Sequence, residues 1–558
     1  MDKENMNSMK KKALAFAAAA CAFGMLLSGC GSSNGDSTAD KGSNVITAYN
    51  SEPQNPLIPG DCNETGGGKP LDLLFARLIS FDAKGNASNE VAESIKSNDD
   101  ATQYTIKLKD GWKFTDGTPV TAESFTKAWS YTANAKNAQL GSSFFSTIKG
   151  YDALQDGDKL KGDEQLEGLK VVNDKEFTVD LNQSDSVFAI KVGYTAFAPL
   201  PESFFKDPKA FGEKPVGNGP YKFQSWDHDN QIVLVKNPDY KGNRVAKNDG
   251  VTFKVYTKDE AAYADIQSGS LDVMESVPAS ATKTFQKDST VQSYNKAGSV
   301  IQQFTIPSNV KHFESGTEEG TLRRQAVSMA INRENICKKV LNGTGTPAAD
   351  FTSPLTPGYS DSLKGSGNLK YNEKKAKELW DKANAISPWT ADDKLTFAYN
   401  ADGGHEVIYT AVVNSINNVL GDGVAATNPY PTFNDFRTAV SDRKVNGAFR
   451  SGWQPDYPSA ENYLMQNFAS SAADGNGSND GDYKNSKFDD LCNQAAASKT
   501  TDDANKLYQK AQEVLLNDLP AVPLYYANAY GVASTGVSGF EMNWQNLPVY
   551  ENMTKSGK

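Results

Sequence analysis

The sequence predicts a mixed α/β protein that folds as two or more lobes. Segments with the periodicity of strands and segments with the periodicity of helices alternate along the chain, which favours layered α/β architecture. The chain has 558 residues, more than one hydrophobic core normally supports. It contains no short internal repeat, so solenoid and propeller folds are disfavoured.

The first 29 residues are predicted to be a secretion signal rather than part of the fold. Three lysines at positions 10–12 precede an apolar run at residues 13–27. That run is shorter than the ~20 residues that a membrane span needs, and with its cationic flank it matches the hydrophobic region of a signal peptide. We therefore expect residues 1–29 to be removed.

Cys30 follows Leu-Ser-Gly, and this run resembles a bacterial lipobox. In such signals the cysteine thiol receives a diacylglyceryl group, and two acyl chains anchor a protein stably where one does not. The alternative is an ordinary signal peptide that is cut elsewhere, with Cys30 incidental. Small and polar residues at 31–44 argue against it, because they are typical of a flexible tether. We expect a lipid on Cys30 and a tether over residues 30–44.

Two segments in the first half of the chain alternate apolar and polar residues and predict half-buried strands. Their apolar positions are Tyr104, Ile106 and Leu108 in the first and Phe177, Val179 and Leu181 in the second. Near the C-terminus, residues 522–526 predict another strand. Residues 470–482 are rich in Gly, Ser, Asn and Asp and predict a mobile loop.

Three helices are predicted from a polar first residue followed by apolar residues at helical spacing. Thr121 caps the first, with Phe125, Ala128, Trp129 and Thr132 inward; Asn372 caps the second, with Ala376, Leu379 and Trp380 inward; Thr501 opens the third, with Leu507, Ala511, Val514 and Leu515 inward and Pro520 at its end.

The net charge of −11 and the pI near 5.1 disfavour nucleic acid as a partner and suit a solvated extracellular protein. Cys62, Cys337 and Cys492 remain after the lipidated cysteine, and this odd number leaves at least one without a partner inside the chain. A Cys337–Cys492 disulfide and buried free thiols both remain open.

Several blocks resemble the family of bacterial extracellular solute-binding proteins that serves importers of peptides, nickel and related solutes (family 5). The most specific is YTIKLKDGWKFTDGTPVTAESF at residues 104–125, which reads as a strand, two tight turns and a helix start. Other blocks follow in the family's order: GNGPYKF at 217–223, SGSLDV at 268–273, LRRQAVSMAINRENI at 322–336 and GTGTP at 343–347. The first block identifies the fold and is expected to have a structural role, without ligand contact.

The resemblance implies a two-lobed periplasmic-binding-protein-like fold of type II, cluster C, with an extra subdomain on lobe I. Two crossing segments would join the lobes, which close over a ligand by hinge motion. Lobe I would comprise residues 45–75, 215–298 and 531–558, the extra subdomain residues 76–214, and lobe II residues 299–530.

The resemblance also places a ligand site on RSGWQPDYP at residues 450–458. In peptide-binding members the aspartate three residues after this tryptophan binds the ligand's α-ammonium, a role that maps to Asp456. Gly452 and its neighbours could pair with an extended peptide through their backbone, and Trp453 could wall a side-chain pocket. Arg450 could steady Asp456 or reach a carboxylate. The alternative is a buried structural ion pair beside a core tryptophan.

Four further positions are candidates for ligand contact. Asn63 and Glu64 precede three glycines, near where peptide-binding relatives place a carboxylate contact. His405 falls where such relatives can carry a histidine for the peptide carboxylate, and Phe433 falls where a pocket tryptophan occurs. A surface role for His405 and a core role for Phe433 are the alternatives.

Two departures from the family put part of this site in doubt. Gln454 stands where some relatives have a cysteine, so their disulfide is absent. Val440 replaces an arginine that contacts ligand carboxylates in relatives, and this change questions a shared mode of C-terminal recognition.

The resemblance implies a monomeric, lipid-anchored binding protein on the extracytoplasmic face of the cell membrane, without cofactor or enzymatic activity. It would deliver peptides to the permease subunits of an ABC importer and their cytoplasmic ATPases. An oligosaccharide or a metal chelate is the alternative ligand within the family.

A secreted hydrolase such as a glycosidase is the alternative of another class, since paired carboxylates cannot be judged by counting. The three histidines, His228, His312 and His405, lie far apart in the sequence and form no His-Glu-x-x-His pattern. No Gly-x-Ser-x-Gly nucleophile motif and no phosphate-binding loop is present.

Overall fold

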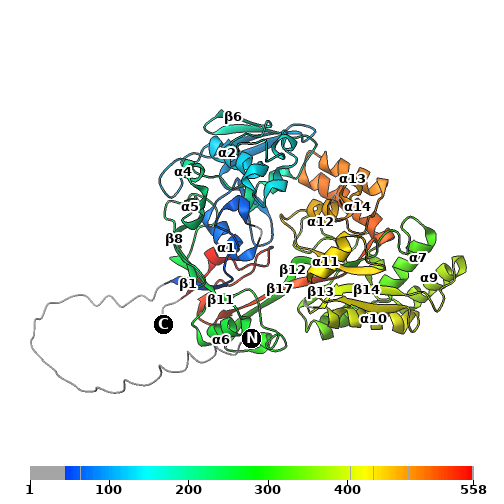
Figure 1. Ribbon diagram of the computed structural model, residues 1–558. Helices are drawn as coiled ribbons and strands as arrows, with labels where there is room; N and C mark the ends of the chain where they lie inside the picture. The colour runs from blue at the N-terminus through cyan, green and yellow to red at the C-terminus, as the bar shows by residue number, and fades with distance from the viewer. Residues whose placement is uncertain (1–43, 63, 402–403, 432, 476, 556–558) are drawn as a thin grey trace, which may run out of the picture. The chain divides into compact units, whose positions relative to one another are not determined.

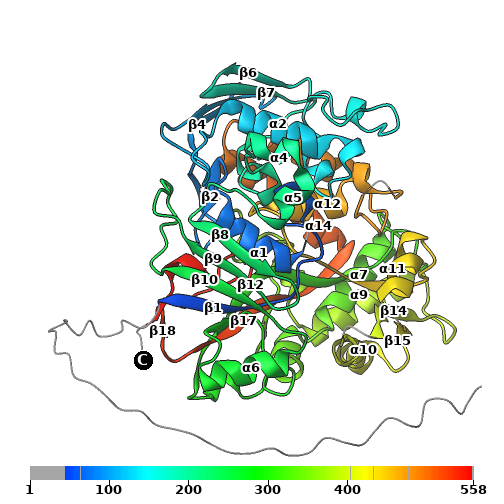
Figure 2. The same cartoon turned by 60° about the vertical axis from the view of Figure 1, so that its left-hand side comes forward.

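The computed structural model describes residues 44–62, 64–401, 404–431, 433–475 and 477–555. Their main element is an eleven-stranded mixed sheet, in which neighbours in space are often far apart in the sequence (Figures 1 and 2). In spatial order its path is β15 (Ala425–Tyr430), β14 (Leu395–Asn400), β16 (Ala448–Trp453), β12 (Val291–Thr305), β17 (Ala521–Ser534), β11 (Val273–Met274), β1 (Val45–Asn50), β10 (Gly250–Val255), β9 (Gln231–Lys236) and β8 (Tyr221–Asp227), and β13 (Gly345–Pro347) pairs with β17 off this path.

The long antiparallel pair of β12 and β17 joins the two lobes. Its register begins with Val291 opposite Ser534 and ends with Thr305 opposite Ala521. At one end β17 also pairs with β11, and at the other end β12 also pairs with β16. The pair thus runs from the part that holds β1 and β8–β11 to the part that holds β14–β16 (Figure 1). These are the two crossing segments that the resemblance implies.

The larger hydrophobic core of the first lobe extends into a separate four-stranded antiparallel sheet, and a smaller core contains Ala262, Tyr263 and Ile266. The order of that sheet is β4 (Ala92–Ser97), β5 (Gln103–Leu108), β7 (Glu176–Asp180) and β6 (Leu169–Asn173). The other elements of this lobe are α1 (Thr65–Leu74), β2 (Ile79–Phe81), β3 (Ala87–Asn89), α2 (Ala122–Ala133), α3 (Phe188–Lys191), α4 (Glu202–Lys206), α5 (Pro208–Glu213), α6 (Asp259–Ser268), β18 (Val537–Ser538) and β19 (Thr554–Lys555).

The second lobe has its own core, built from residues between Phe304 and Tyr525. Val187 also belongs to this core, although its neighbours in the sequence belong to the first lobe. The helices are α7 (Glu318–Met329), α8 (Arg333–Asn335), α9 (Glu373–Ile386), α10 (Glu406–Leu420), α11 (Phe433–Ser441), α12 (Ala460–Phe468), α13 (Ser486–Ala496) and α14 (Thr501–Asp518). Among the described helices, none combines the length and apolar character that a membrane span requires.

The strands and helices predicted from periodicity are confirmed. The alternating segments form β5 and β7, and residues 522–526 lie inside the longer strand β17. The caps are confirmed as well, since Thr121 precedes α2 and the Asn372 side chain accepts a hydrogen bond from the Lys375 N–H at 3.0 Å. In α14, however, Leu507 and Val514 are only half-buried, because the buried face is centred on Tyr508 and Leu515.

The polar loop at residues 470–482 is held by charge. Arg443 donates to both carboxylate oxygens of Asp482 at 3.0 Å, and Arg437 pairs with Asp480 at 2.9 Å. Asn479 is buried and donates to two backbone carbonyls. Arg437 in α11 and Arg443 just after it thus neutralise the carboxylates of Asp480 and Asp482, which are therefore not free to bind a metal cation.

The three cysteines of the described part of the chain are free. Cys337 and Cys492 are buried in the second lobe, and burial raises the pKa of the Cys337 thiol to about 12. Of the two possibilities that the sequence leaves open, buried free thiols are present.

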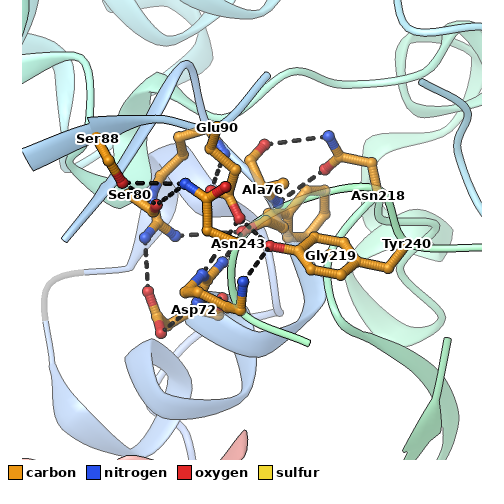
Figure 3. Close-up of polar contacts among 12 residues, drawn as sticks. Asp72, Ala76, Ser80, Ser88, Glu90, Asn218, Gly219, Tyr240 and Asn243 are labelled. Atoms are coloured by element: carbon orange, nitrogen blue, oxygen red, sulfur yellow. Dashed lines mark hydrogen bonds and ion pairs between the residues drawn. The ribbon is translucent and has the colours of Figure 1, made fainter. Parts of the chain in front are cut away.

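The GNGPYKF block has a structural role that Figure 3 shows. Asn218 is 1% exposed, and its side chain accepts from the Ala76 N–H at 2.9 Å and donates to the Ala76 carbonyl at 3.1 Å. The adjacent glycines permit close backbone contact, since a Cβ on Gly217 would lie 2.0 Å from the Leu74 carbonyl oxygen. This block therefore ties the start of β8 to the C-terminal end of α1.

We predict that Asn218→Ala lowers the free energy of unfolding by about 2–4 kcal/mol, because it leaves a buried N–H and a buried C=O without partners. Urea denaturation measures this change. The matched control is Asn493→Ala on the exposed face of α13, which is expected to change stability by no more than about 0.5 kcal/mol. Equal stability of the two variants would contradict the structural role of Asn218.

Candidate functional site

A cavity of about 290 Å³, here called the cleft cavity, lies between residues of the two lobes. The first lobe contributes one face of α1, the loop before it, two residues that follow α3 and two residues near the C-terminus. The second lobe contributes the segment directly after β16. The lining residues are Cys62, Glu64, Thr65, Gly68, Lys69, Asp72, Tyr194, Thr195, Gln454, Pro455, Asp456, Gln545 and Leu547.

Asn462 on α12 positions the predicted ligand segment. It is fully buried, and its Oδ1 accepts from the Trp453 indole N–H at 2.8 Å and from the Asp456 backbone N–H at 3.0 Å. Its Nδ2 donates to the Asp456 carboxylate at 3.1 Å. One amide therefore orients two of the residues that the sequence proposes for ligand contact.

Asp456 presents a carboxylate to the cleft cavity without a cationic partner. No lysine or arginine of the described chain forms an ion pair with it. Burial raises the pKa of the Asp456 carboxyl, the Asn462 hydrogen bond opposes this shift, and nearby Glu461 adds to it. A desolvated carboxylate of this kind is suited to bind a cation.

Tyr194 of the first lobe lies across the cleft cavity from Asp456. Burial raises the pKa of Tyr194, and the charges of Asp456 and Cys62 add to the shift, so these groups are close in space. The Tyr194 ring packs against Phe144 with centroids 4.3 Å apart, which fixes its orientation. The cavity thus pairs a carboxylate from one lobe with a phenol from the other.

The segment from Arg450 to Trp453 leaves one backbone edge open. Strand β16 pairs with β12 over its last five residues, but β14 pairs with it only at Ala448 and Phe449. Among the described strands, no partner faces the other edge beyond Phe449. Gly452 suits this position, since a Cβ there would lie 2.7 Å from the Ile301 carbonyl oxygen. An extended ligand could add to this edge as a further strand.

Arg450 lies on a different cavity from Asp456. This lobe II cavity has a volume of about 400 Å³, and its lining includes Gln303, Arg450, Ser451, Trp453 and Gln454. Gln454 lines the cleft cavity as well, so the two are adjacent. The structure shows no ion pair between Arg450 and Asp456 in the part of the chain that it describes. Of the two roles predicted for Arg450, contact with a ligand carboxylate is the one that its position allows.

Glu64 lies in the cleft cavity, but its carboxylate caps α1. It accepts from the Gly66 N–H at 2.6 Å and from the Gly67 N–H at 2.9 Å. A Cβ on either glycine would come within 2.9 Å of this carboxylate, which explains the glycines at 66 and 67. The Cys62 thiol donates to the Glu64 carbonyl at 3.4 Å, and burial raises its pKa to about 12. Glu64 shapes the cleft by fixing the start of α1.

The other predicted positions lie apart from these cavities or outside the described residues. His405 is half-buried at the start of α10 and does not line the cleft cavity or the lobe II cavity. Phe433 is the first residue of α11, and its side chain is outside the described part. Asn63 also lies outside the described residues. Val440 packs in a small core with Phe436 and Phe449.

Sequence reasoning missed Asn462, Tyr194 and Cys62. Asn462 carried a weak signal, because it occupies a buried position of α12 where an apolar residue would be expected. Tyr194 and Cys62 carried none, since their role depends on which loops the fold brings to the cleft.

Besides the crossing strands β12 and β17, a charged contact near Asp456 joins the two lobes. Lys191 of α3 lies 2.7 Å from Asp185 and 3.6 Å from Glu461 of α12, and its amine lies 5.6 Å from the centroid of the Tyr457 ring. Burial opposes the charge of Lys191, but the two carboxylates raise its pKa. The Ser186 N–H donates to the Ala496 carbonyl at 2.8 Å in the same region. The first turn of α12 thus supplies Glu461 to the contact between the lobes and Asn462 to the predicted ligand segment.

The described residues show no group of three or more His, Cys, Asp and Glu side chains that could hold a metal ion. Two histidines instead take part in charged contacts. His228 lies between Glu52 and Glu213, and His312 lies 2.7 Å from Glu319. These contacts connect segments of chain away from the cleft cavity.

The two lobes joined by crossing strands, with a cavity between them, define a solute-binding protein of the two-lobed periplasmic type. Residues 86–475 match the family model of bacterial extracellular solute-binding proteins, family 5, and the chain belongs to this family. The predicted fold class is thereby confirmed.

Three known proteins illustrate the likeness. The chain is 26% identical over 538 residues to the oligopeptide-binding protein OppA of Bacillus subtilis, covering 93% of this chain and 95% of that protein. The unliganded open form of the murein tripeptide-binding protein MppA has a TM-score of 0.80 at 23% identity, covering 93% and 98% of the two chains. The oligopeptide-binding protein AppA of Bacillus subtilis, solved with a nonapeptide, has a TM-score of 0.66 at 23% identity, covering 92% and 99%.

We predict that Asn462→Ala destabilises the protein by about 2–4 kcal/mol, because the Trp453 indole N–H loses its partner together with two contacts of Asp456. Urea denaturation of Asn467→Ala is the control. Asn467 lies on the same helix and makes one hydrogen bond, to the Tyr463 carbonyl, from a half-buried position. A loss no greater than that of the control would contradict the positioning role of Asn462.

Proposed function

We propose that this protein is the extracytoplasmic, lipid-anchored substrate-binding protein of an ABC importer and that it captures peptides. The observation that carries the proposal is the Asp456 carboxylate, which is half-buried, oriented by Asn462 and without a cationic partner among the described residues. Peptides have a free α-ammonium at one end, and a desolvated carboxylate binds such a group by a short charge-assisted hydrogen bond.

The open edge of β16 supports a peptide over other solutes. A peptide with its ammonium at Asp456 can extend its backbone along residues 450–453, where β14 leaves the edge without a partner. A side chain of the ligand could then enter the lobe II cavity, where Arg450 is available to a carboxylate. A neutral oligosaccharide would gain no ionic contact at Asp456, so it is the weaker candidate.

The relatives support the same ligand class. The proteins named above are described as binding oligopeptides or a murein tripeptide, and AppA was solved with a nonapeptide. Family membership supports delivery to the permease of an ABC importer. The extracytoplasmic position and the lipid on Cys30 rest on the N-terminal sequence. We further propose that the protein acts as a monomer.

We predict that Asp456→Asn weakens peptide binding by about 1.5–3 kcal/mol, the range for a hydrogen bond to a charged group. Calorimetry should use a peptide that mass spectrometry identifies in the purified protein, synthesised with a free and with an acetylated N-terminus. The wild type should prefer the free form, and the variant should not. Equal affinity of the wild type for both forms would exclude the ammonium role.

The same experiment has a pH dependence with a defined sign. The ligand requires the ionised carboxylate, and burial raises the pKa of Asp456 above that of an exposed aspartate. The affinity for peptide is therefore full above the raised pKa of Asp456 and falls as the pH decreases through that pKa. This fall begins at pH values where an exposed aspartate, with a pKa of about 3.9, is still ionised. Asp456→Asn serves as the control, since it should lack this decrease.

We predict that Cys30→Ala moves the protein from the membrane fraction to the soluble fraction of cells that express the full chain, because the diacylglyceryl group needs the thiol. Fractionation and immunoblotting measure the change. Cys62→Ala is the control, since Cys62 lies in the folded part and should not affect the fraction. Membrane retention of the Cys30→Ala protein would contradict the anchor.

A further inference from the structure

Residues 348–360 follow β13 and form a loop, here called the buried loop, that lies beneath the surface. None of its residues is exposed, and Asp350, Thr352 and Ser353 are 0% exposed. Loops normally run over the surface, because a buried loop has backbone polar groups to satisfy. The buried loop must therefore supply hydrogen-bond partners of its own.

The Asp350 carboxylate accepts hydrogen bonds from both ends of the buried loop. Oδ1 accepts from the Thr352 N–H at 2.8 Å, and Oδ2 accepts from the Ser360 N–H at 3.1 Å. The Thr352 hydroxyl lies 3.0 Å from both carboxylate oxygens. Among the described residues, no lysine, arginine or histidine pairs with Asp350. Hydrogen bonds alone therefore hold this charge in the core.

Tyr526 of β17 joins the buried loop to the crossing strands. It is 0% exposed, and its hydroxyl oxygen accepts from the N–H groups of Ala349 at 3.1 Å and Asp350 at 3.0 Å. The hydroxyl proton is left to donate, and its nearer acceptor is Asp350 Oδ1 at 3.1 Å, with the Asp350 carbonyl at 3.3 Å. A hydrogen bond to the charged oxygen is also the stronger of the two. Tyr526 and Asp350 thus fix each other.

Tyr526 also belongs to a row of paired residues that ends at the predicted ligand segment. Ile301 of β12 pairs with Tyr526 on one side and with Trp453 of β16 on the other. Residues that pair directly in antiparallel strands point to the same face of the sheet, so the three side chains are neighbours. Ile301 and Tyr526 share a small core with Tyr463 of α12, and Trp453 packs against it. The Trp453 ring is therefore supported by this core, while Asn462 holds its indole N–H.

We propose that Asp350 is a positioning residue for peptide binding, which holds Trp453 in place through the Tyr526 hydroxyl and Ile301. The inference rests on the proposed function and adds a group that the ligand does not touch. Asp350 lines neither the cleft cavity nor the lobe II cavity, whereas Trp453 lines the lobe II cavity. An effect of Asp350 on peptide binding must therefore pass through other side chains.

The ionisation of Asp350 makes this role measurable. Burial raises the pKa of Asp350 to about 6, although hydrogen bonds from Thr352, Ser360 and Tyr526 oppose the shift. The titratable side chains that face it are the phenols of Tyr359, Tyr463 and Tyr526. Below this pKa the carboxyl carries a proton that needs an acceptor, so Thr352 or Tyr526 must turn its own hydroxyl away. In either case Tyr526 no longer donates to a charged oxygen, and its contact with Asp350 weakens as the pH falls through about 6.

Fluorine NMR of the protein labelled with 5-fluorotryptophan tests the inference without a ligand. The chain has seven tryptophans, and Trp453→Phe identifies the Trp453 resonance. In the wild type this resonance should shift with a midpoint near pH 6. Asp350→Asn and Tyr526→Phe should each lose this transition, since the first removes the titrating group and the second removes the hydroxyl that transmits it. Tyr526→Phe keeps the ring and its packing, so it tests the inference even where Asp350→Asn is unstable.

Two control variants should keep the transition. Asp456→Asn removes the carboxylate three residues after Trp453, so a transition that remains belongs to another group. Asp288→Asn makes the same substitution in a turn of the same kind, in which Asp288 accepts from the Thr290 N–H at 2.9 Å and from the hydroxyls of Thr290 and Tyr263. Asp288 is half-buried in the first lobe and has no part in the core that supports Trp453.

Calorimetry at about pH 7.5, where Asp350 is ionised, measures the effect on peptide binding. The peptide is the one used for Asp456→Asn above. Asp350→Asn and Tyr526→Phe should each weaken its binding about two- to tenfold, and Asp288→Asn should leave it unchanged. The double variant should lose no more than the single variant with the larger loss, because both substitutions break one contact.

The outcomes separate the inference from the function on which it rests. The inference is overturned if the wild type shows no transition near pH 6, if Asp350→Asn keeps it or if Asp456→Asn loses it. It is also overturned if Asp350→Asn and Tyr526→Phe bind the peptide as tightly as the wild type does. All of these results leave peptide binding intact, whereas a wild type that binds no peptide overturns the proposed function as well.

Discussion

The antiparallel pairing of β12 with β17 is the constraint on which the other features of the molecule depend. Two strands of 15 and 14 residues run through both lobes, and each lobe adds its own strands to one end of the pair. A slip of one residue would turn every side chain to the opposite face. Ile301 opposite Trp453 and Gln302 opposite Gly452 show how the register of β12 sets the position of β16. The ligand segment begins where that strand ends.

The elements that could be predicted are those that depend on residues close in the sequence. Apolar spacing and capping residues located α2 and α9, and a short strand-like run located part of β17. The roles of Asn462 and Tyr194 could not be predicted, since they arise from packing between distant segments. Glu64 shows the limit clearly. A carboxylate before three glycines could contact a ligand or cap a helix; the hydrogen bonds to Gly66 and Gly67 establish the cap, and ligand contact stays a prediction.

Buried charged side chains have hydrogen-bond or ionic partners in the core, whereas Asp456 at the proposed site has no cationic partner among the described residues. Arg324 is 1% exposed, and it donates to the carbonyls of Phe313, Ile306 and Leu519 at 2.6–3.0 Å, which binds the end of β12 to the end of α14. Asp185 and Glu461 likewise share Lys191. Among the described residues, the Asn462 amide is the one side chain that donates a hydrogen bond to the Asp456 carboxylate. Leaving one desolvated carboxylate without a cation costs stability, and a ligand that supplies the cation recovers it.

The first turn of α12 connects ligand binding to the contact between the lobes. Glu461 faces Lys191 of the other lobe, and the next residue, Asn462, holds Asp456 and Trp453. Glu461 also contributes to the raised pKa of Asp456, because the two carboxylates repel each other. In the peptide complex proposed above, a ligand ammonium at Asp456 would offset this repulsion and strengthen the attraction of Glu461 for Lys191. Peptide binding and the contact between the lobes would then stabilise each other, as the closing of a hinged cleft requires.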